Sequence, residues 1–404
     1  MSLFKGIVFI IFSVFFILPS YAIEEITLDT KDEAIKMEIY KDKYPSGKEE
    51  YEHVNSKYDI DYDYNKPLSK KFNDVCKLEV SDNNHTEFLL DKITTKHFEN
   101  GPLDNIGVWG VWRGALGINF FNDDTDTQMN YSLLESRIHG EFKNKRTSFL
   151  ITTRYTPQNE FSFMQNLFSE TVIKHKIDKH NTIIIGNNKT KAGQDGGMSM
   201  FLLPFFSYSQ IGRNFGNIRK LGARLSGNYD LIEYDLGGYS SGTYFQEFFP
   251  GAEFCGWVSL KPLAKTKGKY GNLKIGGGLT SGRRHFNYNV VGGYIRYDYK
   301  KFGVDFEIAN SDGSNGRTGP TQAHARGYYT TLYYNLTKKV QLLARFDEFT
   351  PNRDYSSHRI REYSAGLNYF IKGQALKFIL NYIFREDSGT GNSHRILIGT
   401  QILL

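Results

Sequence analysis

Residues Ala375–Arg385, ALKFILNYIFR, carry the pattern on which the fold assignment depends. The large apolar residues occupy every second position: Leu376, Phe378, Leu380, Tyr382 and Phe384. The polar residues Lys377, Asn381 and Arg385 have the opposite parity. Because successive side chains of a strand point to opposite faces, this alternation predicts a strand with one face in hydrocarbon and one in water.

The same alternation recurs elsewhere in the chain. In 302–310, Phe302, Val304, Phe306 and Ile308 oppose Asp305 and Glu307, and in the last run Ile396, Ile398, Ile402 and Leu404 oppose Arg395 and Gln401. A β-sandwich alternates in the same way, but it rarely needs so many long strands with aromatic ends. Interfacial aromatic girdles of a membrane barrel account better for a set of rings near the strand ends: Tyr297, Tyr299, Tyr369, Phe370 and Tyr382.

About sixteen such runs are predicted, mostly of the length that a tilted membrane strand requires. They are 107–119, 131–143, 146–155, 168–177, 181–189, 217–228, 231–239, 252–261, 272–282, 288–299, 302–310, 326–337, 340–349, 360–371, 375–385 and 393–403. The gaps between them alternate between long segments, such as 190–216 and 311–325, and tight turns, such as Asn144-Lys145 and Lys338-Lys339. This asymmetry is typical of outer-membrane barrels. We therefore expect an all-β fold: a transmembrane antiparallel β-barrel of about sixteen strands with long extracellular loops, short periplasmic turns and an inserted third loop.

The composition agrees with a membrane barrel that has a water-filled lumen. Aromatic residues make up 15% of the 404 residues, yet the mean hydropathy is −0.46. Residues 1–22 have Lys5, an apolar core and Ser20-Tyr21-Ala22, which predicts a signal peptide cleaved after Ala22. No later run is apolar enough for a membrane helix, so any insertion must use strands. We expect a signal peptide (1–22), an N-terminal periplasmic extension (23–105) and a porin-type barrel (106–404), located in the cell outer membrane.

Charge and cysteine usage exclude other classes. A net charge of +6 is too small to call for nucleic-acid binding. Cys76 and Cys255 have no CxxC partner and indicate no metal or redox motif; we expect unpaired thiols, although a single disulfide is allowed in an exported protein.

A hairpin-like stretch carries a family resemblance. Asn217–Gly242, NIRKLGARLSGNYDLIEYDLGGYSSG, resembles the matched hairpin of the phosphate-selective porin O and P family at six positions: Arg219, Gly222, Gly227, Tyr234, Gly237 and Gly242. The strand plan extends the likeness over most of 106–404. The resemblance implies a homotrimeric sixteen-stranded outer-membrane channel for small hydrophilic solutes and ions, with outer-membrane lipid around it.

The longest apolar insertion is Thr190–Gly216, TKAGQDGGMSMFLLPFFSYSQIGRNFG, which follows the fifth predicted strand on the long-loop side. We interpret it as a pore constriction loop. Its water-facing charges would be Lys189, Lys191, Asp195 and Arg213, while residues such as Phe201, Leu203 and Phe206 need a wall to pack on. The alternative is an external loop at a subunit interface.

Alternation also assigns charges to the lumen, where they set the ion preference. The inward cations are Arg113, Arg137, Arg154, Lys220, Arg224, Arg296, Arg345, Lys377, Arg385 and Arg395. The inward carboxylates are Glu135, Glu141, Glu233, Asp235, Asp298, Asp305, Glu307, Asp347 and Glu362. Their slight basic excess predicts a weak preference for anions, phosphate among them.

Two motifs point to other chemistry and are weaker. Gly238–Gly242 satisfies G-x-S-x-G, but a nucleophile elbow needs a strand-to-helix turn that is not predicted here, so neither Ser240 nor Ser241 is expected to be catalytic. Asp124–Gln128 with Glu135 resembles a calcium loop, but Met129 stands where glycine is needed. We expect no enzyme activity, no cofactor and no metal. The alternative function is a non-conducting barrel that acts as a cell-wall anchor or adhesin.

Overall fold

The computed structural model describes residues 95–121, 124–128, 132–155, 168–242, 247, 249–266, 268–317, 319–354 and 358–403. The expected signal peptide, residues 23–94 of the expected extension, and Cys76 lie outside these ranges. None of the described helices is long and apolar enough to cross a bilayer.

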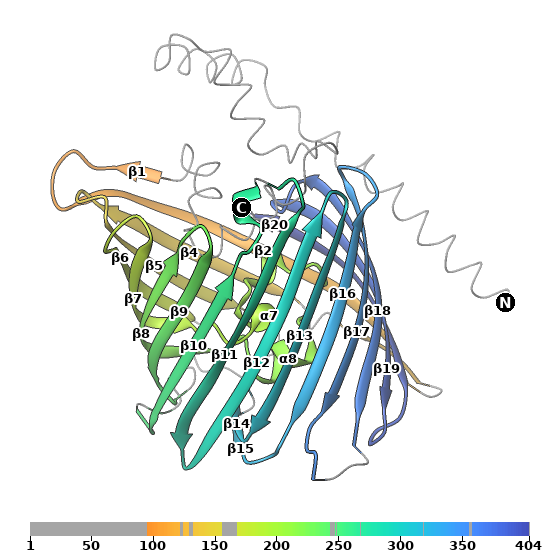
Figure 1. The fold of residues 1–404 in the computed structure, drawn as a ribbon. Helices are drawn as coiled ribbons and strands as arrows, with labels where there is room; N and C mark the ends of the chain where they lie inside the picture. Colours follow the sequence, from red (N-terminus) through yellow and green to blue (C-terminus); the bar gives the residue numbers. More distant parts are fainter. Residues whose placement is uncertain are drawn as a thin grey trace, which may run out of the picture. The chain divides into compact units, whose positions relative to one another are not determined.

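Strands dominate the described chain (Figure 1). In the first half they are β1 (Thr95–His97), β2 (Leu103–Phe121), β3 (Asp124–Gln128), β4 (Leu133–Phe142), β5 (Thr147–Tyr155), β6 (Glu170–Lys176), β7 (Asn181–Lys189), β8 (Arg219–Asn228), β9 (Ile232–Ser240) and β10 (Ala252–Leu260). In the second half they are β11 (Asn272–Arg284), β12 (Phe286–Tyr299), β13 (Phe302–Asp312), β14 (Ser314–Gly316), β15 (Gly319–Thr321), β16 (Arg326–Asn335), β17 (Val340–Thr350), β18 (Ile360–Lys372), β19 (Leu376–Asp387) and β20 (Ser393–Leu403). The described helical turns are α7 (Gln194–Gly197), η1 (Met200–Leu202), α8 (Gln210–Asn214) and η2 (Ala264–Thr266).

Sixteen long strands form one closed antiparallel barrel, as the sequence predicts. The ring closes at β2, which is 19 residues long. Its first half pairs with β4, from Leu103 opposite Phe142 to Arg113 opposite Leu133. Its second half pairs with β20, from Val111 opposite Leu403 to Phe121 opposite Ser393. The short strands β1 and β3 add to β2 outside this ring, and β14 and β15 form a separate ribbon in the loop after β13.

The two faces of the strands differ as the alternation predicts. In β19, Lys377 and Asn381 are almost fully buried inside the barrel, whereas Tyr382 on the opposite parity is 42% exposed. A row of outward rings crosses five neighbouring strands near the long-loop end; it consists of Tyr328, Phe346, Tyr363, Phe384 and His394, with successive centroids 4.8–6.0 Å apart. This row is an aromatic girdle of the kind found at a membrane interface.

One expected girdle residue is wrong. Phe370 is 6% exposed and faces the lumen, whereas its neighbour Tyr369 is 39% exposed on the outer face. Adjacent residues of a strand point to opposite faces, so both rings cannot meet lipid.

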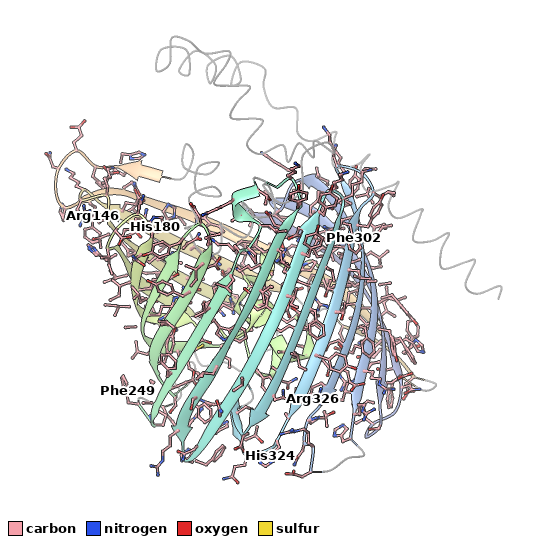
Figure 2. The ribbon with its side chains drawn as sticks, in the orientation of Figure 1. Arg146, His180, Phe249, Phe302, His324 and Arg326 are labelled. Carbon is pink, nitrogen blue, oxygen red and sulfur yellow. The ribbon has the colours of Figure 1, made fainter. Side chains whose placement is uncertain are left out.

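The turns at the two ends differ in length, and the short ones are stabilised by side-chain acceptors. Asn144 Oδ1 accepts the backbone N–H groups of Arg146 and Thr147, Asp178 Oδ1 accepts those of His180 and Asn181, and Thr337 Oγ1 accepts those of Lys339 and Val340. Such local bonds replace the ladder where the chain reverses. Figure 2 marks Arg146 and His180 at this end, and Phe249 and His324 at the end with the long loops. Among the described connections at the short-turn end, 261–271 is the longest, and it contains η2.

Gly186 in β7 allows a close approach to the neighbouring strand. Its φ is 130°, and a Cβ added there would lie 2.2 Å from the carbonyl oxygen of Thr171 on β6. Any side chain at this position therefore strains both strands.

We predict that Gly186→Ala destabilises the barrel by about 1–3 kcal/mol, the usual cost of a forced backbone conformation. The measurement is the urea midpoint of the refolded protein in micelles. The matched control is Gly238→Ala, because a Cβ at Gly238 meets nothing within 4 Å. Equal urea midpoints for the two variants would contradict the conclusion that the backbone at position 186 requires glycine.

Candidate functional site

The connection between β7 and β8, residues 190–218, folds into the barrel (Figure 1). It contains α7, η1 and α8. Ser209 begins α8, and its Oγ accepts the N–H of Gly212 at 3.1 Å. The Asp195 carboxylate accepts the N–H of Ser209 at 2.5 Å, which ties α7 to the start of α8. A Cβ on Gly216 would lie 2.5 Å from the Cα of Gly196, so glycine is needed where the two ends of the loop cross.

The apolar residues of the loop pack on an apolar part of the inner wall. Phe206 lies in a cluster with Ala115, Ile379, Ile383 and Leu397. Phe205 packs with Tyr333 and Leu343, and Ile211 and Phe215 pack with Tyr329 and Phe349. Burial of each large side chain is worth about 1.5–3 kcal/mol. The loop is therefore a packed part of the lumen.

Polar side chains of the wall bind the loop backbone. The Glu307 carboxylate accepts the N–H groups of Gln194 at 2.9 Å and Asp195 at 3.1 Å. Asp347 accepts the N–H of Gln210, and Asn381 accepts that of Phe206, each at 2.7 Å. Loop carbonyl oxygens are satisfied by donors from the wall: Arg113 to Phe205, Asn368 to Pro204, Arg345 to Ser207, Gln401 to Phe201, and Lys377 to Phe201 and Leu203. Irregular backbone inside a barrel requires such partners, since buried peptide groups must be hydrogen-bonded.

The four charges predicted for the loop occupy different environments. Lys189 Nζ donates to the Met198 carbonyl and the Tyr208 hydroxyl. Asp195 is only 2% exposed and lies 3.8 Å from Arg345. Arg213 lies 2.7 Å from Glu362, with its side chain 32% exposed. Lys191 is half-buried and lines a cavity of about 30 Å³ with Glu233, Asp235 and Lys274. Of these four, Asp195 is the one enclosed within the loop.

The carboxylates around Arg213 also affect its titration. Burial acts to lower the pKa of Arg213, but the Glu362 and Asp347 carboxylates outweigh burial, so the pKa lies above its ordinary value. The guanidinium therefore stays charged at all working pH values.

The ten predicted lumen cations all lie on the inner wall, buried or half-buried. Arg113, Arg345 and Lys377 bind the loop, as described above. The others contact wall residues: Arg137 and Arg154 contact Glu135, Lys220 contacts Glu253, Arg224 contacts Asp235, Arg296 contacts Asp298 and Asp305, Arg385 contacts Glu362 and Asp387, and Arg395 contacts Asn119.

Charge is distributed unequally around the lumen. The wall from β4 to β8 includes eight buried or half-buried cations, Arg137, Arg154, Lys174, Lys176, Lys189, Arg219, Lys220 and Arg224, and three carboxylates, Glu135, Glu141 and Glu170. The wall from β12 to β18 includes five carboxylates, Asp298, Asp305, Glu307, Asp347 and Glu362, with Arg296 and Arg345. A basic wall facing an acidic one creates a transverse field across the lumen.

Several lumen residues were not predicted. Arg219 is buried although it adjoins the buried Lys220, which simple alternation does not allow. Ile379, Ile383 and Leu397 face inward as the pad for Phe206. For Ile379 and Ile383 of β19, the sequence contains a signal that predicts their inward burial. ALKFILNYIFR has apolar residues at both odd and even positions, which indicates a strand buried on both faces.

The first weak motif lies at the end of β9, and residues Asp124–Gln128 of the second form β3. Ser240 ends β9 and its Oγ accepts the N–H of Gly242, and residues 241 and 242 are not helical. Glu135 of the calcium-like pattern lies on β4 between two arginines. Among the described residues, no group of His, Cys, Asp and Glu is arranged to hold a metal ion.

Residues 259–402 match the family model of the phosphate-selective porins O and P. The chain resembles this porin family. Solved porins share the fold: the anion-selective porin from Comamonas acidovorans has a TM-score of 0.56 at 8% identity and covers 74% of this chain and 99% of its own. Salmonella typhi OmpF has a TM-score of 0.55 at 11% identity, covering 76% of this chain and 99% of its own. Pseudomonas putida OprB has a TM-score of 0.54 at 10% identity, covering 80% and 96%. No curated protein matches the sequence. At these identities the porins show the fold alone.

For this porin-like loop we predict that Glu307→Ala releases its first helical turn. Two hydrogen bonds to a carboxylate are lost, each worth about 1.5–3 kcal/mol. Hydrogen exchange of a peptide that covers Gln194 and Asp195, measured by mass spectrometry, should become roughly tenfold faster or more. Glu307→Gln, which keeps one acceptor oxygen, should have a smaller effect. Exchange at the wild-type rate in the Ala variant would refute this role.

Proposed function

We propose that the protein is an outer-membrane porin: a passive diffusion channel for small hydrophilic solutes and ions with a weak preference for anions. The observation that carries this proposal is the charged lumen of a closed barrel, narrowed by a loop bound to one part of its wall. The family match over 259–402 and the porin fold support it. The geometry of the lumen and the electric field of its charged side chains would govern transport, because no bond is made or broken.

The path for solutes would pass beside the loop, along the wall from β8 to β11. The loop backbone is bound to β2, β7, β13 and β17–β20. On the other side, Lys191 of the loop faces Glu233, Asp235 and Lys274 across the small cavity.

Anion preference would come from the basic wall from β4 to β8, which adjoins the proposed path at β8. Its cations outnumber its carboxylates, and wall charges focus counter-ions in a low-dielectric channel. The short-turn end would face the periplasm and the long loops the exterior, as in bacterial outer-membrane barrels. We further propose a homotrimer, as the resemblance implies; native mass spectrometry of the purified protein would test it.

Single-channel recording in a planar bilayer tests the channel itself. In a KCl gradient we predict discrete openings and a reversal potential of the sign that chloride selectivity gives. An inserted protein without conductance would instead favour the alternative, a barrel that serves as an anchor or adhesin.

Removal of the loop core tests the constriction. Deletion of Gly196–Tyr208 should raise the conductance without loss of insertion, because the segment contains the apolar residues that fill the lumen. The ends are close enough to join, since Asp195 and Ser209 are already hydrogen-bonded. Unchanged conductance in a correctly inserted deletion variant would exclude the constriction role.

Substitution of the charged residues at the small cavity tests the proposed ion selectivity. Lys191→Gln should lower the chloride-to-potassium permeability ratio by about twofold, which corresponds to roughly 0.4 kcal/mol for a partly exposed charge. Glu233→Gln should change the ratio in the opposite direction. The control is Lys179→Gln, on an exposed turn outside the lumen. An equal effect of the control would mean that the two lumen charges do not set the preference.

A further inference from the structure

The ribbon formed by β14 and β15 belongs to the connection between β13 and β16, at the end of the barrel with the long loops (Figure 1). The base of this connection is closed by Ser311 and Ala325. The N–H of Ser311 donates to the Ala325 carbonyl at 2.8 Å, and the N–H of Ala325 donates to Ser311 Oγ at 3.1 Å. Ser314 and Asn315 are each 5% exposed, so other parts of the protein cover β14.

The side chain of Asn315 binds the ribbon to the ends of neighbouring strands. Its Nδ2 donates to the Ser241 carbonyl at 2.7 Å and to the Tyr288 hydroxyl at 3.1 Å. Its Oδ1 accepts from Arg284 Nη1 at 3.3 Å. Ser241 directly follows β9, Arg284 ends β11 and Tyr288 lies on β12. One amide side chain therefore connects the ribbon to three strands of the wall.

These contacts continue into the charged lumen. The Tyr288 hydroxyl donates to Glu253 Oε2 at 2.5 Å, and the same carboxylate forms a buried ion pair with Lys220 of the basic wall. The ribbon is therefore connected by hydrogen bonds to the wall that adjoins the proposed solute path.

The ribbon also lies against the inserted loop. A Cβ on Gly316 would lie 2.1 Å from the carbonyl oxygen of Asn214, which ends α8. The base of the connection packs at the same place, since Ala325 shares a buried cluster with Ile211 and Phe215. The ribbon thus spans from α8 to β9, β11 and β12, across the long-loop end of the path proposed along β8–β11.

Hydrogen bonds, and not apolar burial, hold the ribbon in this place. β14 consists of Ser314, Asn315 and Gly316, none of which has a large apolar side chain. Gly313, with a φ of 66°, precedes it and allows the chain to turn inward. Each net hydrogen bond shifts a conformational equilibrium by only roughly two- to tenfold. A segment held in this way detaches more easily than the strands of the closed barrel.

We propose that the β14–β15 ribbon is a lid on the long-loop entrance of the solute path, and that Asn315 is its latch. With the three hydrogen bonds of Asn315 made, the ribbon narrows the entrance between α8 and β9–β12. When Asn315 leaves these partners, the ribbon turns outward at Gly313 and the entrance widens. The lid rests on the proposed function, because it acts on the path described there.

Two variants release the lid by different means. Asn315→Ala removes the three hydrogen bonds, and Gly316→Ala places a methyl group against the Asn214 carbonyl. In planar bilayers with the full chain, we expect wild type to alternate between a smaller and a larger conductance level. The ratio of time at the larger level to time at the smaller level should rise by roughly tenfold or more in both variants. Hydrogen exchange of a peptide that covers Ser314–Gly316 should become faster to a similar degree.

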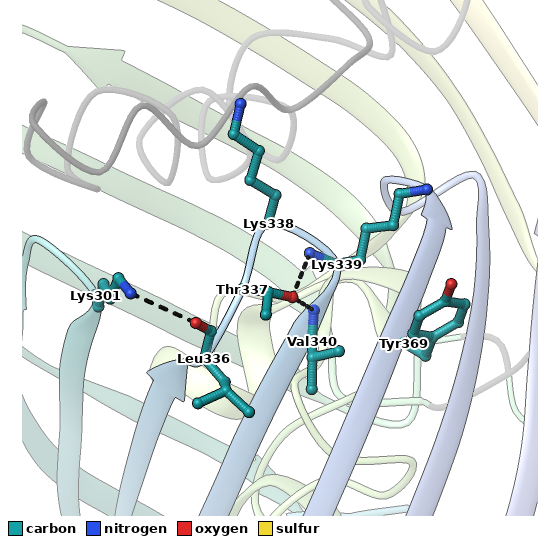
Figure 3. A pocket seen from close by; sticks show the side chains of 7 residues that line it. All are labelled: Lys301, Leu336, Thr337, Lys338, Lys339, Val340 and Tyr369. Carbon is teal, nitrogen blue, oxygen red and sulfur yellow. Dashed lines mark hydrogen bonds between the residues drawn. The ribbon is translucent and has the colours of Figure 1, made fainter.

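Matched controls separate a lid from general loosening of the barrel. Asn287→Ala removes an exposed asparagine next to Tyr288. Thr337→Ala loosens the β16–β17 turn at the opposite end, where Thr337 Oγ1 accepts the N–H groups of Lys339 at 3.1 Å and Val340 at 3.0 Å (Figure 3). Both controls should keep the wild-type ratio of conductance levels. Heat-modified migration on gels verifies that each variant is folded.

The possible outcomes distinguish the lid from the channel. A wild-type protein that inserts and never conducts would overturn the channel and the lid together. A conducting wild type with a single level, or with a ratio that Asn315→Ala leaves unchanged, would overturn the lid alone. An equal rise in the two controls would do the same. Exchange at 314–316 that stays at the wild-type rate in Asn315→Ala would show that this side chain is not the latch, which also refutes the proposal.

Discussion

Closure of the backbone hydrogen-bond ladder is the constraint on which the whole structure depends. In hydrocarbon no water is available to an unpaired N–H or C=O group, so a sheet that spans a membrane must have no free edge. β2 meets this requirement by pairing with β4 over its first half and with β20 over its second half. Once the ring is closed at β2, each residue of a strand has only two directions available, outward or inward.

The inward direction is where this chain differs from a plain water-filled tube. Acidic and basic side chains that would line an open pore instead hold the inserted loop. Glu307, Asp347 and Asn381 accept its N–H groups, and Arg113, Arg345 and Lys377 bind its carbonyls. An isolated buried charge is costly, but it is tolerated when hydrogen bonds satisfy it. The loop and the charged wall thus depend on each other.

This mutual dependence also explains why the polar lumen contains an apolar area. Phe206 needs Ile379, Ile383 and Leu397 as partners, so β19 and β20 have apolar residues on both faces at this level. The wall from β4 to β8 keeps its cations in ion pairs: Arg137, Arg154 and Arg219 lie beside Glu135 or Glu170, and Lys220 and Arg224 pair with Glu253 and Asp235. The result is a lumen with a packed side and a charged side.

Local pattern by itself determined the strands, their number and the alternation of short and long connections. The predicted run 181–189 coincides with β7, and 393–403 coincides with β20, because a period of two and a turn signal are local properties. The position and apolar content of 190–216 also indicated that this segment needs a wall. The sequence pattern alone did not reveal on which strands of the barrel wall this segment packs. Gln194 and Glu307 are 113 positions apart, and Gln401 and Phe201 are 200 apart. Only closure of the barrel brings such residues together, so only the tertiary structure decided that Asp195 is enclosed and that Arg219 joins the basic wall. Local alternation fixes a direction for a side chain, but its partner depends on strands that are distant in the sequence.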